Sequence, residues 1–346
     1  MLERYERIEG SDPELALRRF SLMLSKGDTV GLLSESRRLV AENPVNSDYM
    51  LIRGNVFEAI EMPDSALRCY LQAESMDPDD GRPKLTLANY YLERGDSAAY
   101  DVKSREALLS ENIMLDEKLQ MMTRYMQNII ADSADTARGT RLFDGLLGQY
   151  PHEPRLLDLG AQYFAATDNL ERAEELMAYA TDLDPDNPDY WLRLASFYFS
   201  DQKYSLSQDA AERGIARLKE TPRTLLYILG AAAVMNGEYA KAREVYQRQL
   251  DMDMPGTLLT DSVDAVLKKA SSLDFSTLEK IAGIFAMAGD CSSKQDDLQA
   301  AVREYEVSVA LDPTNMMSAN NYAFFLAISG GDLDLSLIHI SEPTRP

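Results

Sequence analysis

Apolar and polar residues alternate along most of this chain with the 3.6-residue period of amphipathic helices. Pro44 and Pro78 each end such a helical pattern, and they lie 34 residues apart. A period of this length, with two helices in each unit, is typical of a repeat protein. On this alignment the predicted units start near residues 13, 47, 81 and 115, and then near residues 153, 188 and 223.

Residue size also repeats within the predicted units. The eighth position of the first helix is small, and a small residue on the second helix faces it, which lets the two backbones approach closely. An aromatic residue one turn later fills the space against the following unit. The eighth-position residues are Gly54, Ala88, Gly160, Ala195, Gly230, Ala282 and Ala323. The facing small residues are Ala66, Ala173, Ala242 and Ala301, and the aromatic residues are Tyr70, Phe143, Tyr246 and Tyr305.

Glycine followed by an acidic residue marks the predicted turn between the two helices of a unit, because glycine tolerates a positive φ. Such pairs are Gly27-Asp28, Gly95-Asp96, Gly237-Glu238 and Gly289-Asp290. A proline then ends the second helix, since it cannot donate a backbone hydrogen bond there. One shared register for all these positions favours a repeat array over an ordinary helical bundle.

Two segments resemble a known family closely. In the segment 187–198, Trp191, Leu194, Ala195 and Tyr198 match the signature of the first helix of the tetratricopeptide repeat. The segment 237–246 is similar to the consensus turn and second helix. The resemblance covers about residues 13–334. It implies an all-α fold, a right-handed α-solenoid of tetratricopeptide helix–turn–helix repeats.

The resemblance divides the chain into regions. Residues 1–255 are predicted to form an array of about seven repeats, and residues 256–274 an extra helix. Residues 275–334 predict an eighth repeat, with an insertion between its helices at Cys291–Asp296, and a ninth repeat that is cut after its first helix. In that last helix Tyr322 and Leu326 are expected to be exposed.

Residues 335–346 form a separate case. Their sequence resembles a translated sequencing adapter fused to the chain, and its β-branched residues and two prolines cannot continue an amphipathic helix. We therefore exclude this segment from the predicted fold and function.

The charge of the chain excludes some classes of partner. The formal net charge is −22, from 57 acidic and 35 basic residues. Such a field repels phosphate backbones and anionic lipid surfaces, so nucleic acid is not expected as a partner. No segment approaches the roughly 20 apolar residues of a membrane-spanning helix, so no such segment is predicted.

The sequence contains none of the common catalytic or metal-binding motifs, such as GxxxxGK[ST], GxSxG, HExxH or CxxC. The acidic run Asp182–Asn187 lacks the glycine and the distal glutamate of a calcium-binding loop. Its carboxylates are expected to cap the next helix. Cys69 and Cys291 are predicted to be free thiols. We therefore predict that the chain is not an enzyme and has no catalytic residue, no metal site and no cofactor.

The resemblance implies where partners bind. In tetratricopeptide proteins the first helices line a concave surface, and the second, fifth, ninth and twelfth positions face the ligand. Here the implied binding residues are Leu51, Asn55, Leu85, Asn89, Leu157, Phe164, Leu192, Phe199, Tyr227 and Val234. Two interpretations stay open: these residues are consensus packing or polar filler, or residues 153–234 form an apolar trough for a hydrophobic peptide or a partner helix.

One subclass of the family binds the acidic C-terminal tails of heat-shock chaperones through a lysine at the fifth position and an asparagine at the ninth. Asn55 and Asn89 occupy the ninth position, but the fifth position holds Leu51 and Leu85. A bound carboxylate would be desolvated there without a countercharge. Chaperone acidic tails are therefore not expected as partners.

The predicted function is a protein–protein interaction scaffold or adaptor that binds peptide or helical segments on the concave solenoid face. The segment 320–327, followed by Gly-Gly-Asp-Leu, resembles long tetratricopeptide proteins of Bacteroides-type bacteria. That resemblance implies a place in the periplasm or cell envelope, with the export signal missing from this fragment. The alternative is a regulatory or sensor arm of a larger protein whose output or catalytic domain lies outside the fragment.

Overall fold

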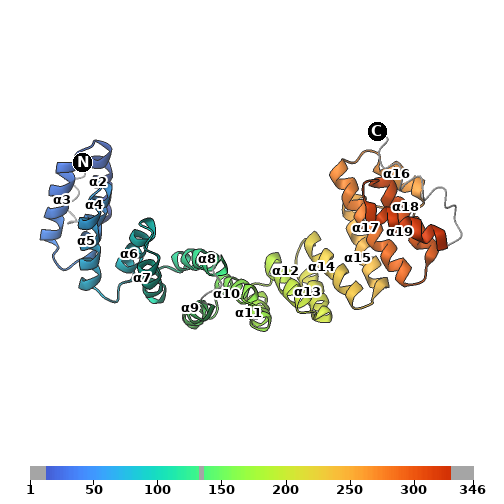
Figure 1. Ribbon diagram of the computed structural model, residues 1–346, viewed down its shortest axis with the longest axis horizontal. Coiled ribbons are helices and arrows are strands. Elements are labelled where there is room, and N and C mark those ends of the chain that lie inside the picture. Colours follow the sequence, from blue (N-terminus) through green and yellow to red (C-terminus); the bar gives the residue numbers. More distant parts are fainter. Residues whose placement is uncertain (1–12, 132–135, 329–346) are drawn as a thin grey trace. The chain divides into compact units, whose positions relative to one another are not determined.

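The computed structural model describes residues 13–131 and 136–328, which hold 18 helices and no strand (Figure 1). Contacts divide the chain into two compact units, Met1–Pro151 and His152–Pro346. The helices of the first unit are α2 (Pro13–Ser25), α3 (Thr29–Glu42), α4 (Ser47–Ala59), α5 (Pro63–Met76), α6 (Gly81–Glu93), α7 (Ser97–Leu109), α8 (Leu115–Ala131) and α9 (Thr136–Gln149).

The second unit follows the same order of paired helices. Its helices are α10 (Pro154–Ala166), α11 (Leu170–Leu183), α12 (Pro188–Ser200), α13 (Tyr204–Arg217), α14 (Arg223–Met235), α15 (Tyr239–Asp253), α16 (Val263–Ala270), α17 (Phe275–Lys294), α18 (Leu298–Leu311) and α19 (Met316–Ile328). The short helix α16 lies inside the segment for which the sequence predicts an extra helix.

Each first helix packs against the second helix that follows it, as in α4 with α5, α12 with α13 and α17 with α18. The second helix then contacts the first helix of the next pair, as α13 contacts α14 and α18 contacts α19. The core therefore continues from pair to pair within each unit. This sequential packing is the arrangement of an α-helical repeat fold.

Small residues at the eighth position make room for a tyrosine from the paired helix. A Cβ atom on Gly54 would lie 2.2 Å from Cε1 of Tyr70, and one on Gly230 would lie 2.8 Å from Cε1 of Tyr246. Each of these tyrosines follows its glycine by 16 residues. The hydrogen side chain of glycine is thus needed for the close approach of the two helices.

The turns between paired helices use a glycine and an acidic residue as the sequence predicts. Gly27, Gly95 and Gly237 have φ values of +68°, +73° and +75°, in the left-handed region that glycine tolerates. The carboxylate of Asp96 then accepts a hydrogen bond from the N–H of Ala99 and caps α7. Glycine therefore ends the first helix, and the acid begins the second.

The eighth repeat differs from its prediction. Cys291–Lys294 form the last turn of α17 and do not belong to an insertion between helices, and the following turn lies at Asp296, whose φ is +58°. Gly289 is helical, and a Cβ on it would lie 3.1 Å from the ring of Tyr305. The eighth position is therefore Gly289, not Ala282, and the extra residues lengthen α17 at its N-terminal end.

The last described helix, α19, also differs from its prediction. Tyr322 and Leu326 are buried against α18 in a cluster that includes Tyr305, and the ring of Phe325 stacks on Tyr305 with a centroid separation of 5.5 Å. Phe324 is among the apolar side chains that α19 exposes instead. The predicted adapter segment, residues 335–346, lies outside the described residues.

A buried ionic cluster joins three helices of the second unit. Nη2 of Arg243 on α15 lies 2.7 Å from Oε1 of Glu304 on α18, which is fully buried. The hydroxyl of Ser292 on α17 donates to Oε2 of Glu304 at 2.6 Å. Desolvation raises the pKa of Glu304 despite these partners. Since an unpaired buried carboxylate is costly, the cluster fixes how these helices pair.

The contact between Gly230 and Tyr246 gives a test of the packing register. Gly230→Ala should lower the free energy of unfolding by about 1–3 kcal/mol, because the added methyl group meets the tyrosine ring. Gly283→Ala is the matched control, since Gly283 is also helical and a Cβ there has nothing within 4 Å. That control should raise stability by up to about 1 kcal/mol.

Urea unfolding followed by circular dichroism measures both variants, and amide hydrogen exchange in α14 and α15 locates the effect. Equal stability of the Gly230→Ala variant and the unmodified protein would contradict the assigned contact.

Candidate partner-binding surface

In the first unit, the predicted binding residues lie at the surface of α4 and α6. Leu51 and Leu85 are half-buried, while Asn55 and Asn89 are exposed. The hydroxyl of Tyr70 lies 2.8 Å from both Oδ1 of Asn55 and a carboxylate oxygen of Glu58, and it donates to one of them at a time. Two polar groups of this face are therefore held by a core residue.

The same arrangement occurs in the second unit. The ring of Tyr305 passes over Gly289, and its hydroxyl donates a hydrogen bond to the carboxylate of Asp290. Asp290 is the ninth position of the repeat when Gly289 is the eighth. The sequence contains the signal for this contact, namely a glycine at the eighth position followed 16 residues later by a tyrosine. From the sequence these tyrosines are expected to serve in packing alone, and their polar role is not predicted.

Two predicted binding residues of α10 lie in the core instead. Leu157 and Phe164 are 2% and 1% exposed. The helix begins at Pro154, one residue later than the predicted repeat, and proline is favoured at the first helical position. This places the fully buried Ala161 at the eighth position instead of Gly160. The polar residues Asp158 and Gln162 of α10, in contrast, are half-buried.

Those polar residues form a network with α12. Oδ1 of Asp158 lies 2.6 Å from Nε of Arg193, and the amide of Gln162 donates to Asp158 at 3.1 Å. Desolvation raises the pKa of Asp158 more than the charge of Arg193 lowers it. α10 is the first helix within residues 153–234, for which an apolar trough is predicted. Because α10 carries the charged Asp158, which pairs with Arg193, the trough is interrupted there.

The remaining four predicted residues are apolar side chains on α12 and α14, two helices that contact each other. We call this set, which consists of Leu192, Phe199, Tyr227 and Val234, the α12–α14 strip. Tyr227 is 61% exposed, and the other three side chains are half-buried. The ring of Phe199 meets that of Tyr204 edge-on, with centroids 5.2 Å apart, which restrains it.

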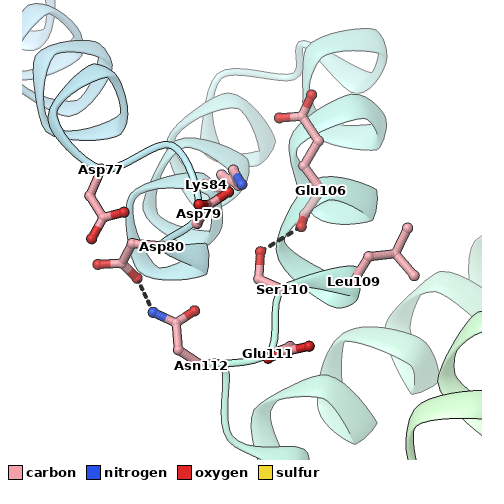
Figure 2. Close-up of a pocket in the computed structure, with 9 residues that line it drawn as sticks. All are labelled: Asp77, Asp79, Asp80, Lys84, Glu106, Leu109, Ser110, Glu111 and Asn112. Atoms are coloured by element: carbon pink, nitrogen blue, oxygen red, sulfur yellow. Dashed lines mark hydrogen bonds between the residues drawn. The ribbon is translucent and has the colours of Figure 1, made fainter.

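The first unit contains a separate hollow of about 710 Å³ between the loops that follow α5 and α7 (Figure 2). Asp80 lies at its edge, where its carboxylate accepts hydrogen bonds from Nη2 of Arg82 at 2.7 Å and from Nδ2 of Asn112 at 2.5 Å. Oδ1 of Asn112 accepts the N–H of Gly81 at 2.8 Å. Through these two hydrogen bonds Asn112 links the start of α6 to the loop that precedes α8.

These hydrogen bonds determine the ionisation of Asp80. Desolvation by burial favours the neutral acid, but the hydrogen bonds from Arg82 and Asn112 outweigh it, and the pKa of Asp80 lies below its ordinary value. The hollow has further acidic residues on its walls, but across the described residues no group of three or more His, Cys, Asp or Glu side chains is placed to hold a metal ion. The role of Asp80 and Asn112 is structural.

Comparison with known proteins agrees with this geometry. The paired helices, with small residues under a tyrosine of the partner helix, define an α-helical repeat protein. Residues 159–220 and 201–255 match the model of the tetratricopeptide repeat family. Residues 159–255 are therefore tetratricopeptide repeats, and the described helices have the sequential paired packing of that repeat fold. A search of curated proteins finds no match.

Solved structures of similar chains include three repeat proteins. MamA from Desulfovibrio magneticus RS-1 (13% identity, TM-score 0.40) matches over 55% of this chain and 92% of its own. YrrB, described as having an unusual peptide-binding site, is 16% identical over 57% of this chain and 92% of its own, with a TM-score of 0.41. PilW, a type IV pilus biogenesis factor, is 16% identical over 61% of this chain and 94% of its own, with a TM-score of 0.36.

Tetratricopeptide repeat proteins generally mediate protein–protein interactions and are typically non-catalytic. Within residues 13–131 and 136–328, no helix has the length and apolar character needed to cross a membrane.

The Asp80 contacts generate a test that depends on pH. Because its folded pKa is lowered, Asp80 contributes stability above the unfolded pKa of about 3.9, and this contribution is lost as the pH falls through the folded pKa. Asp80→Asn should therefore destabilise the first unit by about 1–3 kcal/mol at pH 7, and the difference from the unmodified protein should shrink below pH 4.

Asp79→Asn is the matched control, since Asp79 is exposed on the same loop. Chemical unfolding at a series of pH values measures all three proteins. A destabilisation by Asp80→Asn that does not change with pH would show that the carboxylate charge is not what stabilises this loop.

Proposed function

We propose that this protein is a scaffold or adaptor that binds peptide or helical segments of partner proteins on the outward face of its first helices. The observation that supports this function is the α12–α14 strip. It gathers four apolar side chains, one of them 61% exposed, on two neighbouring first helices. Single exposed apolar residues are common, but a group framed by polar side chains marks an interaction site.

The spacing of the strip favours a helical or extended partner segment. Leu192 and Phe199 lie seven residues apart on α12, and Tyr227 and Val234 lie seven apart on α14. Seven residues make two helical turns, a rise of about 10.5 Å. The strip thus offers two apolar side chains on each of two neighbouring helices, and apolar residues at i, i+3 or i+4 and i+7 of a partner helix can pack against them.

The face differs between the two units. In the first unit it presents the amides of Asn55 and Asn89 between half-buried leucines. When the hydroxyl of Tyr70 donates a hydrogen bond to Oδ1 of Asn55, the N–H groups of that amide remain available to a partner. The amides suit the backbone carbonyls of an extended peptide, whereas the α12–α14 strip suits apolar side chains. We place the main binding energy on the strip, because burying large apolar side chains contributes most.

Selection of peptides from a displayed random library against the whole protein tests this function. The selected peptides should bind at least about tenfold more weakly when Leu192 and Tyr227 are both replaced by serine, a change of about 1.4 kcal/mol or more. Leu206→Ser is the matched control, because Leu206 is 48% exposed on the second helix α13. It should leave the affinity unchanged.

Isothermal titration calorimetry with the selected peptides gives the affinities, and circular dichroism confirms that the variants stay folded. If the selected peptides bind the doubly substituted protein as tightly as the unmodified one, the strip is not the binding surface and the proposed function is wrong in its main part.

A further inference from the structure

Three cationic groups, on α12, at the start of α14 and in the turn after α12, already have acidic partners within the protein. Arg193 pairs with Asp158 at 2.6 Å, and Arg223, at the start of α14, pairs with Asp253 at 2.8 Å. Lys203, in the turn after α12, lies 2.6 Å from Glu174 and 2.7 Å from Asp201. To use any of these three charges, an anionic partner would have to break an existing ion pair.

Acidic side chains, in contrast, outnumber basic ones in the second unit. Asp189 is exposed on the first turn of α12, and among the described residues no lysine or arginine forms an ion pair with its carboxylate. It lies near enough to Asp158 for its negative charge to add to the desolvation that raises the pKa of Asp158. Residues 152–346 as a whole hold 31 acidic and 17 basic side chains. The field over this unit is therefore negative.

We infer that the strip binds a cationic amphipathic helix, whose apolar side chains cover Leu192, Phe199, Tyr227 and Val234 and whose flanking lysines or arginines face the carboxylate of Asp189. This inference rests on the proposed function and adds the chemistry of the partner. A cationic segment gains long-range attraction to the unit and pairs with Asp189 without opening an existing ion pair. The exposed ring of Tyr227 can also accept a cation over its face.

Three fluorescent peptides of about 15 residues test this chemistry (two apolar rows span roughly two helical turns). The first has leucine at i, i+3, i+4 and i+7 positions and lysine elsewhere, the second replaces every lysine by glutamate, and the third replaces every leucine by serine. Fluorescence anisotropy gives their affinities for the whole protein at about 0.15 M and 0.5 M salt, because added salt screens the charge contribution.

The leucine–lysine peptide should bind at least about tenfold more tightly than both others at the lower salt, and the advantage over the glutamate peptide should shrink at the higher salt. Leu192→Ser combined with Tyr227→Ser should weaken it by about tenfold or more. Asp189→Asn should weaken it about two- to fivefold, whereas Asp264→Asn, which removes the same charge from an exposed site on α16, should not.

Each other result contradicts a defined part of the inference. If the glutamate peptide binds as tightly as the lysine peptide and still depends on Leu192 and Tyr227, the cationic partner is wrong while the proposed function stands. If the serine peptide binds as tightly as the leucine–lysine peptide, attraction is by charge alone and the amphipathic helix is wrong. If the combined substitution of Leu192 and Tyr227 by serine changes none of the affinities, the inference and the proposed function both fail.

Discussion

The contact between a glycine at the eighth position and a tyrosine of the paired helix is the constraint on which the rest of this structure depends. A Cβ added at Gly54 or Gly230 would overlap the ring of the tyrosine, and one added at Gly289 would lie 3.1 Å from it. Protein interiors are packed too densely to absorb such an overlap. The contact therefore fixes both the distance between the helices of a pair and their rotation, and this rotation decides which residues face outward.

The same contact links the core to the binding face. Because glycine at the eighth position has only a hydrogen atom as its side chain, the tyrosine hydroxyl can reach the residue at the ninth position. It forms a hydrogen bond with Asn55 in one unit and with Asp290 in the other. At Ala231, which follows Gly230, no polar side chain is available, and this part of the face is apolar beside Tyr227. The polar or apolar character of the face is thus set locally, by one residue next to each glycine.

The repeat itself could be predicted from the sequence because size, helix-ending proline and glycine–acid turns recur in one register. Where two small residues are neighbours, as at Gly160 and Ala161, composition cannot choose between them, and the start of α10 at Pro154 decides. Gly289-Asp290 looks like a turn, but no residue from Cys291 to Lys294 ends a helix, so α17 continues. The buried pair of Arg243 and Glu304 joins residues too distant in sequence for a repeat pattern to indicate.

The charges around the strip follow from the same packing. Arg193 on α12 pairs with Asp158 on α10, whose side chain is only 19% exposed, so these two charges are matched between neighbouring first helices. Because Arg193 already has an acidic partner, the surplus negative charge of the unit is what a partner meets at this face, and that field attracts a cationic segment.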